Sequence, residues 1–177
     1  SQTIDDFRDY FNPEKQATTF SLKYIINKAI SLLDTQLKNK NIKTITNLED
    51  ITIFGFENEF LQVIINIINN SKDEFEKKEI ENRYIFIDIK QEEKAVKIFI
   101  KDNAGGIDNE VINRIFDSHF TTKLKSDGTG VGLYMSKEII EKHMNGQITV
   151  SNEEILLEDI YYKGACFEII VFKEESI

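Results

Sequence analysis

Segments in which apolar and polar residues alternate recur along the chain in closely spaced pairs, with amphipathic stretches between the pairs. The paired segments are 42–48 with 51–56, 84–90 with 95–101, and 146–151 with 165–172. Period-two alternation predicts half-buried strands. Apolar residues at helical spacing predict helices over 24–37 and 57–75, and a third helix that ends near His143. Strand pairs that alternate with about three helices favour a two-layer α/β sandwich with a mixed sheet over a doubly wound parallel sheet.

Shorter segments complete the predicted order of elements. Residues 18–22 are β-prone, a short helix is predicted near 109–116, and the stretch 153–164 (EEILLEDIYYKG) reads as an insert between the last two strands. At the N-terminus, Ile4, Phe7 and Phe11 have helical spacing and Pro13 ends the pattern. We therefore expect residues 1–16 to be the remnant of a preceding helix and its connection, and residues 17–177 to form one domain.

Composition excludes several classes of function. The chain has 177 residues, is 41% apolar and contains one proline, which fits a single globular domain with a full core. Its longest apolar runs are much shorter than a membrane span, so no direct membrane contact is expected. A net charge of −9 disfavours nucleic-acid binding, because nucleic-acid phosphates need a basic face. The single cysteine, Cys166, excludes an internal disulfide, fits a reducing compartment and is predicted to be a core residue.

The helix predicted over 57–75 carries a polar stripe beside its apolar one. Glu59, Gln62, Asn66, Asn70 and Asp73 follow one another at spacings of three or four, so they share one helix face. Asparagine is a poor helix former, so two of them one turn apart need an explanation. One interpretation is a solvated face. The other is a pocket wall in which the amide oxygen of Asn70 binds a hard cation such as Mg²⁺, which prefers oxygen ligands and keeps water and phosphate in its shell.

Two glycine-bearing turns lie between residues 101 and 133, separated by a segment with few features of a stable element. The first follows a strand and contains Asp102, Ala104 and Gly106. An ionised carboxylate only accepts hydrogen bonds, so Asp102 would suit the exocyclic amine of adenine and repel the guanine oxygen at that position. The alternative is an ordinary strand-ending turn.

The second turn, GTGVGL, runs from Gly128 to Leu133 and opens directly onto a helix-like run. It matches neither the dinucleotide G-x-G-x-x-G pattern nor a Walker loop. Free amides at a helix N-terminus favour phosphate, whereas a flexible hinge is the simpler interpretation. Lys123, between the two turns, could reach a phosphate or be a solvated lysine. The only two histidines, His119 and His143, have no partners at zinc spacing, and no hydrolase triad stands out.

In this order the motifs resemble the ATP-binding catalytic domain of sensor histidine kinases, within the superfamily of Hsp90, gyrase and MutL ATPases. FLQVIINIINNSKD is similar to the N box, DNAGG to the first glycine box, IFDSHFTTK to the F box, GTGVGLYMSKEIIEKHMNG to the second glycine box and GACFEIIVF to the closing strand. The resemblance covers residues 18 to 172. It implies a Bergerat-type fold, a five-stranded mixed sheet on three helices, with ATP between the N-box helix and a lid.

The resemblance also implies roles for individual residues. Asn70 would hold Mg²⁺, Asp102 would recognise adenine, and the glycines of the second turn would bind phosphates under a lid packed by Phe116 and Phe120. The implied ATP-binding set is Asn66, Asn70, Asp73, Asp102, Ala104, Gly106, Ile107, Phe120, Thr121, Lys123, Gly128, Thr129, Gly130, Val131, Gly132 and Leu133.

The sequence departs from the family pattern at three places. Ala104 replaces a glycine of the first glycine box, a small change that is expected to preserve binding. Ser118 and His119 replace the Pro-Phe that is common in the F box, which affects the packing of the lid. Asp73 stands where many relatives carry a basic residue, so it is not expected to contact phosphate although it lies on the binding face.

The function implied is transfer of the γ-phosphoryl group of Mg·ATP to a histidine in two-component signalling. That histidine would belong to a helical dimerisation domain outside this chain, and a response regulator would be the next partner. The domain would be cytoplasmic and the full-length kinase a homodimer, with membrane anchoring of the full protein left open. Two alternatives are a protein serine kinase of the anti-sigma-factor type, and a nucleotide-sensing module that binds ATP without transferring phosphate.

Overall fold

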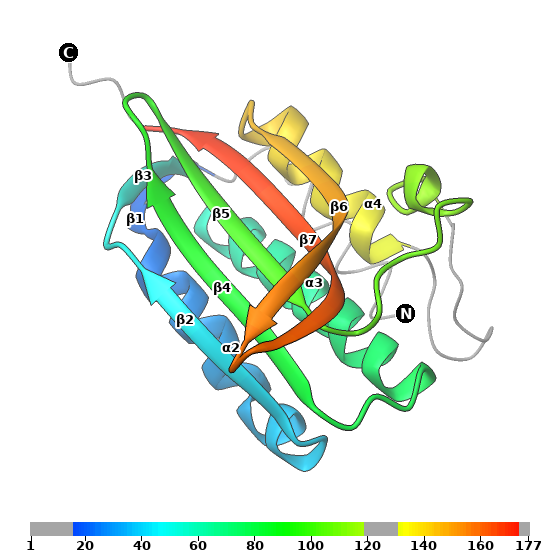
Figure 1. Cartoon of the computed structure of the whole chain (residues 1–177). Helices are drawn as coiled ribbons and strands as arrows, with labels where there is room; N and C mark the ends of the chain where they lie inside the picture. The colour runs from blue at the N-terminus through cyan, green and yellow to red at the C-terminus, as the bar shows by residue number, and fades with distance from the viewer. Residues whose placement is uncertain (1–15, 119–130, 174–177) are drawn as a thin grey trace.

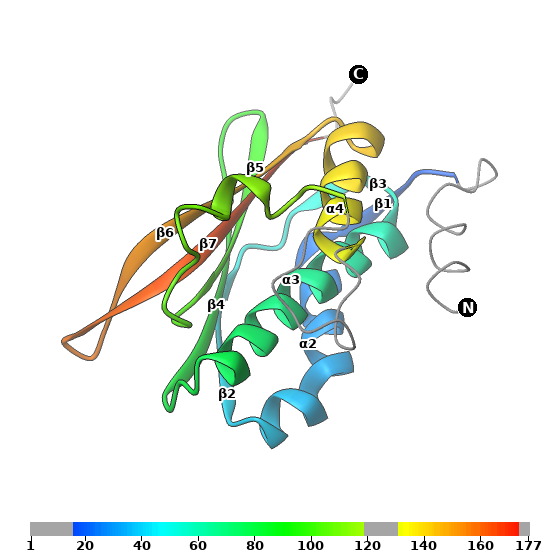
Figure 2. The same cartoon turned by 90° about the vertical axis from the view of Figure 1, so that its right-hand side faces the viewer.

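The computed structural model describes residues 16–118 and 131–173. Five strands form one mixed sheet in the order β2-β4-β5-β7-β6, in which β2 and β4 are parallel and the other neighbours are antiparallel. The strands are β2 Ile42–Leu48, β4 Arg83–Gln91, β5 Ala95–Asp102, β6 Gln147–Leu157 and β7 Ile160–Phe172. Three helices, α2 Leu22–Asn39, α3 Glu57–Lys77 and α4 Val131–Glu138, lie on one side of this sheet (Figures 1 and 2). The predicted two-layer sandwich is therefore confirmed.

The core fills the space between the three helices and the sheet face that they cover. Strand residues at alternate positions point into it, among them Ile85, Ile87 and Ile89 of β4 and Val96, Ile98 and Ile100 of β5. The apolar stripe of α3 meets them with Phe60, Val63, Ile64, Ile67 and Ile68, all fully buried. Alternation in the strands and helical spacing in α3 thus bury both apolar faces in one interface.

The pairing of the second and third strands differs from the prediction. β3, Thr52–Gly55, does not form a hairpin with β2 but pairs antiparallel with β1, Thr18–Ser21, in a separate two-stranded sheet. β2 instead runs parallel to β4, to which it is connected through β3 and α3. Alternation identifies a strand but not its partner, which is why closeness in sequence was misleading here.

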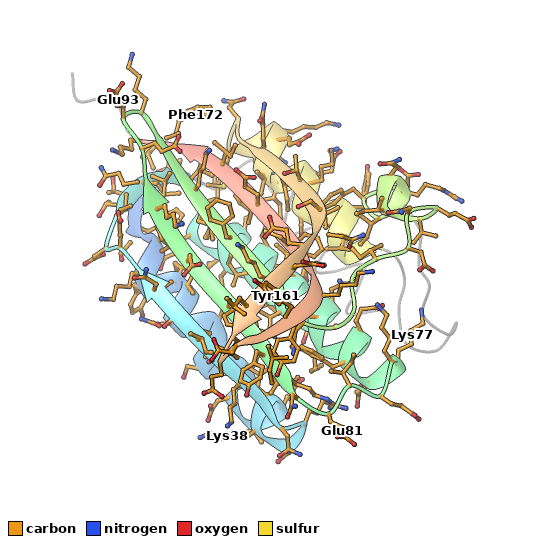
Figure 3. The ribbon with its side chains drawn as sticks, in the orientation of Figure 1. Lys38, Lys77, Glu81, Glu93, Tyr161 and Phe172 are labelled. Atoms are coloured by element: carbon orange, nitrogen blue, oxygen red, sulfur yellow. The ribbon has the colours of Figure 1, made fainter. Side chains whose placement is uncertain are left out.

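The stretch 153–164 is not an insert. It continues β6 and β7 into a hairpin that is paired from Gln147↔Ile170 to Leu157↔Ile160, and Glu158 and Asp159 form its turn with φ of 51° and 64°. Two left-handed residues are typical of the tight turns that match strand twist. The tip of the hairpin projects away from the helices (Figure 2), and Tyr161 near the tip is exposed (Figure 3). Runs of three apolar residues on each strand hide its period-two pattern.

Of the remaining predicted helices, the one near 109–116 is shorter than predicted and the one ending near His143 is present. Between 109 and 116 there is only a 3₁₀ turn, Ile112–Arg114. α4 continues as a π-helical turn, Ile139–His143, which ends where the sequence predicted. No helix of the described residues is long and apolar enough to cross a membrane. Residues 1–15 of the predicted helix remnant lie outside the described residues.

No described helix covers the sheet face opposite α2, α3 and α4 (Figure 2), and this face carries polar and aromatic side chains. Lys90 and Lys101 both lie over the Phe99 ring, at 5.6 and 5.5 Å from its centroid. Cys166 is on the same face but only 3% exposed, and its burial raises the pKa of the thiol to about 12. The thiol therefore stays protonated at neutral pH. Cys166 is buried, but on the sheet face away from the core in which it was predicted to lie.

Candidate nucleotide-binding site

The carboxylate of Asp102 lies at the buried end of β5 and is 2% exposed. Its Oδ2 accepts a hydrogen bond from the Ser71 hydroxyl at 2.7 Å. Its Oδ1 accepts from the backbone N–H groups of Ala104 at 3.0 Å and Ala165 at 3.3 Å. These donors come from α3, from the turn after β5 and from β7, so three elements converge on one side chain. An ionised carboxylate has about four acceptor positions, and these donors leave one of them on Oδ2.

Burial raises the pKa of Asp102 above its ordinary value, because removing a carboxylate from water disfavours the charged form. The hydrogen bonds from Ser71, Ala104 and Ala165 and the nearby ammonium of Lys78 act in the opposite direction and lower the pKa. A buried acidic group that is stabilised only in part is typical of a functional site rather than of a strand end on the surface.

Two neighbours fix the backbone around Asp102. A Cβ added to Gly164 of β7 would lie 1.5 Å from the carbonyl oxygen of Asp102, so only glycine lets β7 pass this close. Asn103, 3% exposed, accepts a hydrogen bond from the Tyr84 N–H at 2.8 Å and donates to the Asn82 carbonyl at 2.7 Å. The end of β5 is thereby tied to the start of β4 on one side and packed against β7 on the other.

The glycine turn continues directly from Asp102. Ala104, which replaces a family glycine, is 2% exposed and makes its backbone contact with Asp102. Gly105 and Gly106 have φ of 87° and 82°, a region that a residue with a Cβ rarely adopts. The N–H of Gly105 donates to the Lys163 carbonyl of β7 at 3.0 Å.

Two side chains hold the far end of this turn. The Lys78 ammonium, at the end of α3, donates to the carbonyl of Gly106. Asn152 of β6 binds the backbone of Ile107 in both directions, with its Oδ1 accepting from the N–H and its Nδ2 donating to the carbonyl, each at 2.7 Å. Ile107 can therefore contact a ligand through its side chain, which packs against the core, but not through its main chain.

The polar stripe of α3 is neither a solvated face nor simply a pocket wall. Its first half fastens α3 to α4 and the π-helical turn: Glu59, 2% exposed, bonds His143 Nδ1 at 2.8 Å. Asn66 Nδ2 donates to the Gly132 carbonyl at 3.1 Å and to Ser136 Oγ at 3.2 Å, while its Oδ1 accepts from Gln62 at 2.8 Å. Both donor positions of the Asn66 amide are thus in use between the helices.

The second half of the stripe fits the predicted metal-binding role better. The side chain of Asn70 is half-buried and makes no hydrogen bond with a described residue, so its oxygen can serve as a ligand. Asp73 follows on the same face one turn later. Among the described residues there is no group of three or more histidine, cysteine, aspartate or glutamate side chains that could hold a metal ion. A Mg²⁺ ion at Asn70 would take its other ligands from phosphate and water, as this ion commonly does.

The start of α4 lies next to this stripe. A Cβ at Gly132 would meet only side-chain atoms of Asn66, at 3.6 to 3.8 Å, and Leu133 packs against the core. Phe116 lies between the layers, edge-on to the Phe167 ring at 6.2 Å and under the Lys137 ammonium. Of the other predicted residues, Phe120, Thr121, Lys123, Gly128, Thr129 and Gly130 lie outside the described residues, as does the side chain of Val131.

A second hollow, of about 410 Å³, lies on the other side of the glycine turn. It is lined by the turn and the β6–β7 hairpin, and none of its lining residues comes from α3 or α4. Asp108, Glu153 and Glu154 outnumber the single Lys163 in its lining. This acidic lining does not suit a polyphosphate, so the hollow does not match the nucleotide pocket that the sequence predicts.

Comparison with known proteins accounts for this arrangement. Residues 55–176 match the family described as Histidine kinase-, DNA gyrase B-, and HSP90-like ATPase. The chain belongs to this family. Sporulation kinase A of Bacillus subtilis (strain 168) is 36% identical over 151 residues, which are 84% of this chain and 23% of that protein. Sensor protein TdiS of Thauera aromatica is 29% identical over 154 residues, 84% of this chain and 27% of that protein. The chain thus spans about a quarter of the length of these relatives.

Solved structures show which members of the ATPase family have a fold similar to that of this chain. The nucleotide-free catalytic domain of histidine kinase ThkA is 26% identical, with a TM-score of 0.72, and the match covers 90% of this chain and 99% of that domain. The mycobacterial sensor histidine kinase MprB shares the fold at 15% identity, with a TM-score of 0.74. The predicted resemblance to histidine kinase catalytic domains is confirmed.

Several residues that shape this ATPase-family site were not predicted from the sequence. Ser71, Lys78 and Asn103 all lie within bonding reach of Asp102 or its turn, and Asn152 and Gly164 reach the turn from the last two strands. A signal existed for Ser71 alone, because it is a polar residue on the buried side of an otherwise apolar helix. The others depend on which strands meet at the end of β5, which alternation does not specify.

Proposed function

We propose that this domain binds Mg·ATP with the adenine at Asp102 and the phosphates toward the start of α4. The observation that carries the proposal is the Asp102 carboxylate, which is buried, held by three donors and left with one acceptor position. Ser71, which touches Asp102, and Asn66, which touches Gly132, are five residues apart on α3. At 1.5 Å per residue this is about 7.5 Å along the helix axis, which leaves room for an extended ligand between the two ends.

Asn70 lies between these two contacts and would hold the metal. When bound, Mg²⁺ would neutralise phosphate charge in a chain whose net charge is −9. The chemistry of the Asn70 side chain fits this role, since it offers an amide oxygen and makes no bond with a described residue. We expect Asn70→Ala to remove the Mg²⁺ dependence of ATP binding while ADP binding without metal changes little, as measured by calorimetry.

We further propose that the γ-phosphoryl group passes to a histidine on a separate helical domain. The catalytic domain of histidine kinase ThkA, at 26% identity, favours histidine over serine as the acceptor. Phosphoryl transfer depends chiefly on positioning and charge stabilisation, so a domain without its own acceptor can supply most of the catalysis. Residues 1–16 would then connect to the helical domain, with residues 17–177 as the ATP-binding domain of a homodimeric kinase.

A response regulator is the proposed next partner. One structural neighbour is histidine kinase ThkA in complex with response regulator protein TrrA, which matches 98% of this chain with a TM-score of 0.70. Since both ATP and such a regulator must reach the domain, we place it on the cytoplasmic side.

Calorimetry with Mg·ATP against Mg·GTP tests the site. Asp102 accepts a hydrogen bond from the amine of adenine, whereas guanine presents an oxygen at that position and is repelled. We expect heat with ATP and little or none with GTP. Equal heat with the two nucleotides, or none with either, would remove the basis of the assignment.

Transfer needs a separate experiment. Joined to the helical domain that precedes it in the full protein, the ATPase domain is expected to produce acid-labile, base-stable phosphate on histidine from ATP. Acid-stable phosphate on serine would instead identify a serine kinase. ATP binding with no phosphorylated protein would identify a nucleotide-sensing module.

A further inference from the structure

Asn152 lies in the exposed part of β6, and its side chain makes two hydrogen bonds with the main chain of Ile107 at the end of the glycine turn. It is opposite Ala165 in the β6–β7 hairpin, one residue past Ser151↔Cys166, where β7 also has its last pair with β5. Its side chain therefore extends from a part of the hairpin that no other strand borders. An amide offers one acceptor and donors on the same group, as a backbone residue does. Asn152 thus pairs with Ile107 in the way that a neighbouring strand would.

The residues of the glycine turn place few constraints of their own on its backbone conformation. Gly105 and Gly106 stand just before Ile107 with positive φ, and glycine has the widest choice of backbone conformations. The hairpin holds the turn at two points: the Lys163 carbonyl binds the N–H of Gly105 at 3.0 Å, and Asn152 binds both main-chain groups of Ile107 at 2.7 Å. A Cβ at Gly106 would come within 2.9 Å of Asn152 Oδ1, so the contact is close-packed.

We propose that Asn152 is a positioning residue for the nucleotide site, which it serves by holding the glycine turn in its binding conformation before the nucleotide arrives. The proposal rests on the proposed function, because it assigns the turn to the adenine end of that site. Asn152 lies on the hollow side of the turn, away from α3, and needs no contact with nucleotide. Asn152 acts through Ile107. It makes hydrogen bonds with both main-chain groups of Ile107, and the side chain of Ile107 packs on the core.

The expected change in nucleotide affinity follows from the fraction of molecules in which the glycine turn has its binding conformation. The apparent dissociation constant of a ligand rises as the fraction of binding-competent molecules falls. Losing two hydrogen bonds of ordinary strength is expected to weaken nucleotide binding about tenfold. ATP and ADP should be affected alike, because both carry adenine. In the transferring kinase the effect should appear in KM, with kcat little changed, since the reacting phosphate lies at the other end of the site.

The test compares Asn152→Ala and Asn152→Asp with Asn47→Ala. Asn47 is a matched control, an exposed asparagine on the opposite edge strand whose side chain bonds no described residue. Asn152→Asp keeps the acceptor for the Ile107 N–H but places a second oxygen against the Ile107 carbonyl. Each variant of this chain is measured by calorimetry with Mg·ATP and with ADP, by hydrogen exchange at the Ile107 amide, and by thermal unfolding.

We expect both Asn152 variants to bind the two nucleotides about tenfold more weakly. The Ile107 amide should exchange faster in Asn152→Ala, with an unfolding temperature close to that of Asn47→Ala. Nucleotide affinity within twofold of wild type would overturn the inference, and so would weaker binding with unchanged exchange at Ile107. If Asn152→Ala does not fold, the nucleotide affinity of Asn152→Asp decides instead, because this variant keeps the acceptor for the Ile107 amide. If the wild-type chain binds no nucleotide, the proposed function itself is refuted. If the wild-type chain binds nucleotide and the Asn152 variants bind it equally well, only the inference about Asn152 is refuted.

Discussion

At the scale of single residues, the site depends on a carboxylate that is costly to bury. Asp102 is 2% exposed, and its pKa is raised by burial although three hydrogen bonds oppose the rise. The native state therefore binds a proton on Asp102 more readily than the unfolded chain does. The contribution of this group to the free energy of unfolding is largest below the ordinary carboxyl pKa and is lost as pH rises through the folded pKa. The proposed function has the opposite pH dependence, because adenine recognition by Asp102 would need the ionised carboxylate.

Ser71→Ala tests this balance. The Ser71 hydroxyl lowers the pKa of Asp102, so its removal should raise that pKa further. As pH is lowered, ATP affinity should begin to fall at a higher pH in the variant than in wild type. We also expect a loss of about 1–3 kcal/mol in the free energy of unfolding at neutral pH.

Calorimetry across pH and urea unfolding measure the two effects of Ser71→Ala. Ser31→Ala, an exposed serine on α2, is the control and should change neither. Identical pH profiles for the Ser71 variant and wild type would mean that this hydroxyl does not tune the carboxylate.

Gly164→Ala tests how closely β7 must pass Asp102. The added Cβ would lie 1.5 Å from the Asp102 carbonyl oxygen, which is a backbone atom that cannot turn aside. We expect the free energy of unfolding to fall by more than about 3 kcal/mol, with ATP binding lost. Urea unfolding measures the change.

Gly132→Ala is the matched substitution at the start of α4. Its Cβ would make only ordinary contacts with the Asn66 side chain, and alanine is the better helix former. This variant should be as stable as wild type or more stable by up to about 1 kcal/mol. Equal stability of the two glycine variants would show that β7 has room to move.

At the scale of elements, α3 joins the two ends of the site. Ser71 on α3 touches Asp102, and Asn66 touches the start of α4, so the helix sets the separation between the proposed adenine end and the proposed phosphate end of the site. Glu59 and His143 make a second link between α3 and the segment that continues α4. The polar stripe is therefore an interhelical contact in its first half, and its second half is the surface that we propose to face the ligand.

Asn66→Ala tests the link to α4, and Asn69→Ala is a control on the same helix turn. Asn66 makes three hydrogen bonds, so its loss should lower the free energy of unfolding by about 1–3 kcal/mol and weaken ATP binding. Asn69 Oδ1 is buried with no partner, so Asn69→Ala should be neutral or stabilising. Chemical unfolding of both variants checks this. Similar losses for the two would contradict the assigned role of Asn66.

Sequence reasoning recovered the elements better than their partners. The apolar stripe of α3 and the alternation of β4 and β5 gave the correct elements, because burial on one face leaves a period in the sequence. Alternation carries no record of which strands are neighbours, so the β1–β3 ribbon and the parallel β2–β4 pair were missed. The hairpin tip was missed because exposed strands lose the pattern.

The same reasoning explains which site residues could be predicted. Asp102, Gly106 and Ile107 lie within six residues of one another, in a turn that the sequence makes recognisable. Asn152 and Gly164 belong to the site only through the register of β6 and β7. Asn66 was predicted to lie on the binding face of α3 and to bind ATP; the structure shows that its amide donates to Gly132 and Ser136 between two helices. Contacts made through tertiary pairing leave no local signal.

At the scale of the whole molecule, a net charge of −9 is compatible with polyphosphate binding only if the site is locally built for it. The candidate site residues lie on the helical side of the sheet, and the opposite sheet face carries lysine, glutamate and aromatic side chains. Under the proposed function, the nucleotide would bind on the helical side and the acceptor histidine would come from another domain.

The most direct test is the binding of Mg·ATP to Asp102→Asn, measured by calorimetry beside urea unfolding. Asparagine matches the shape of aspartate, can accept from Ala104 and Ala165 through its oxygen, and can donate to Ser71, so the fold should keep its stability to within about 1 kcal/mol or gain. The new side-chain amide would direct an N–H donor at the exocyclic amine of adenine, which is also a donor. The affinity for Mg·ATP should therefore fall at least about 100-fold. A folded Asp102→Asn that binds Mg·ATP as tightly as wild type would contradict the central claim.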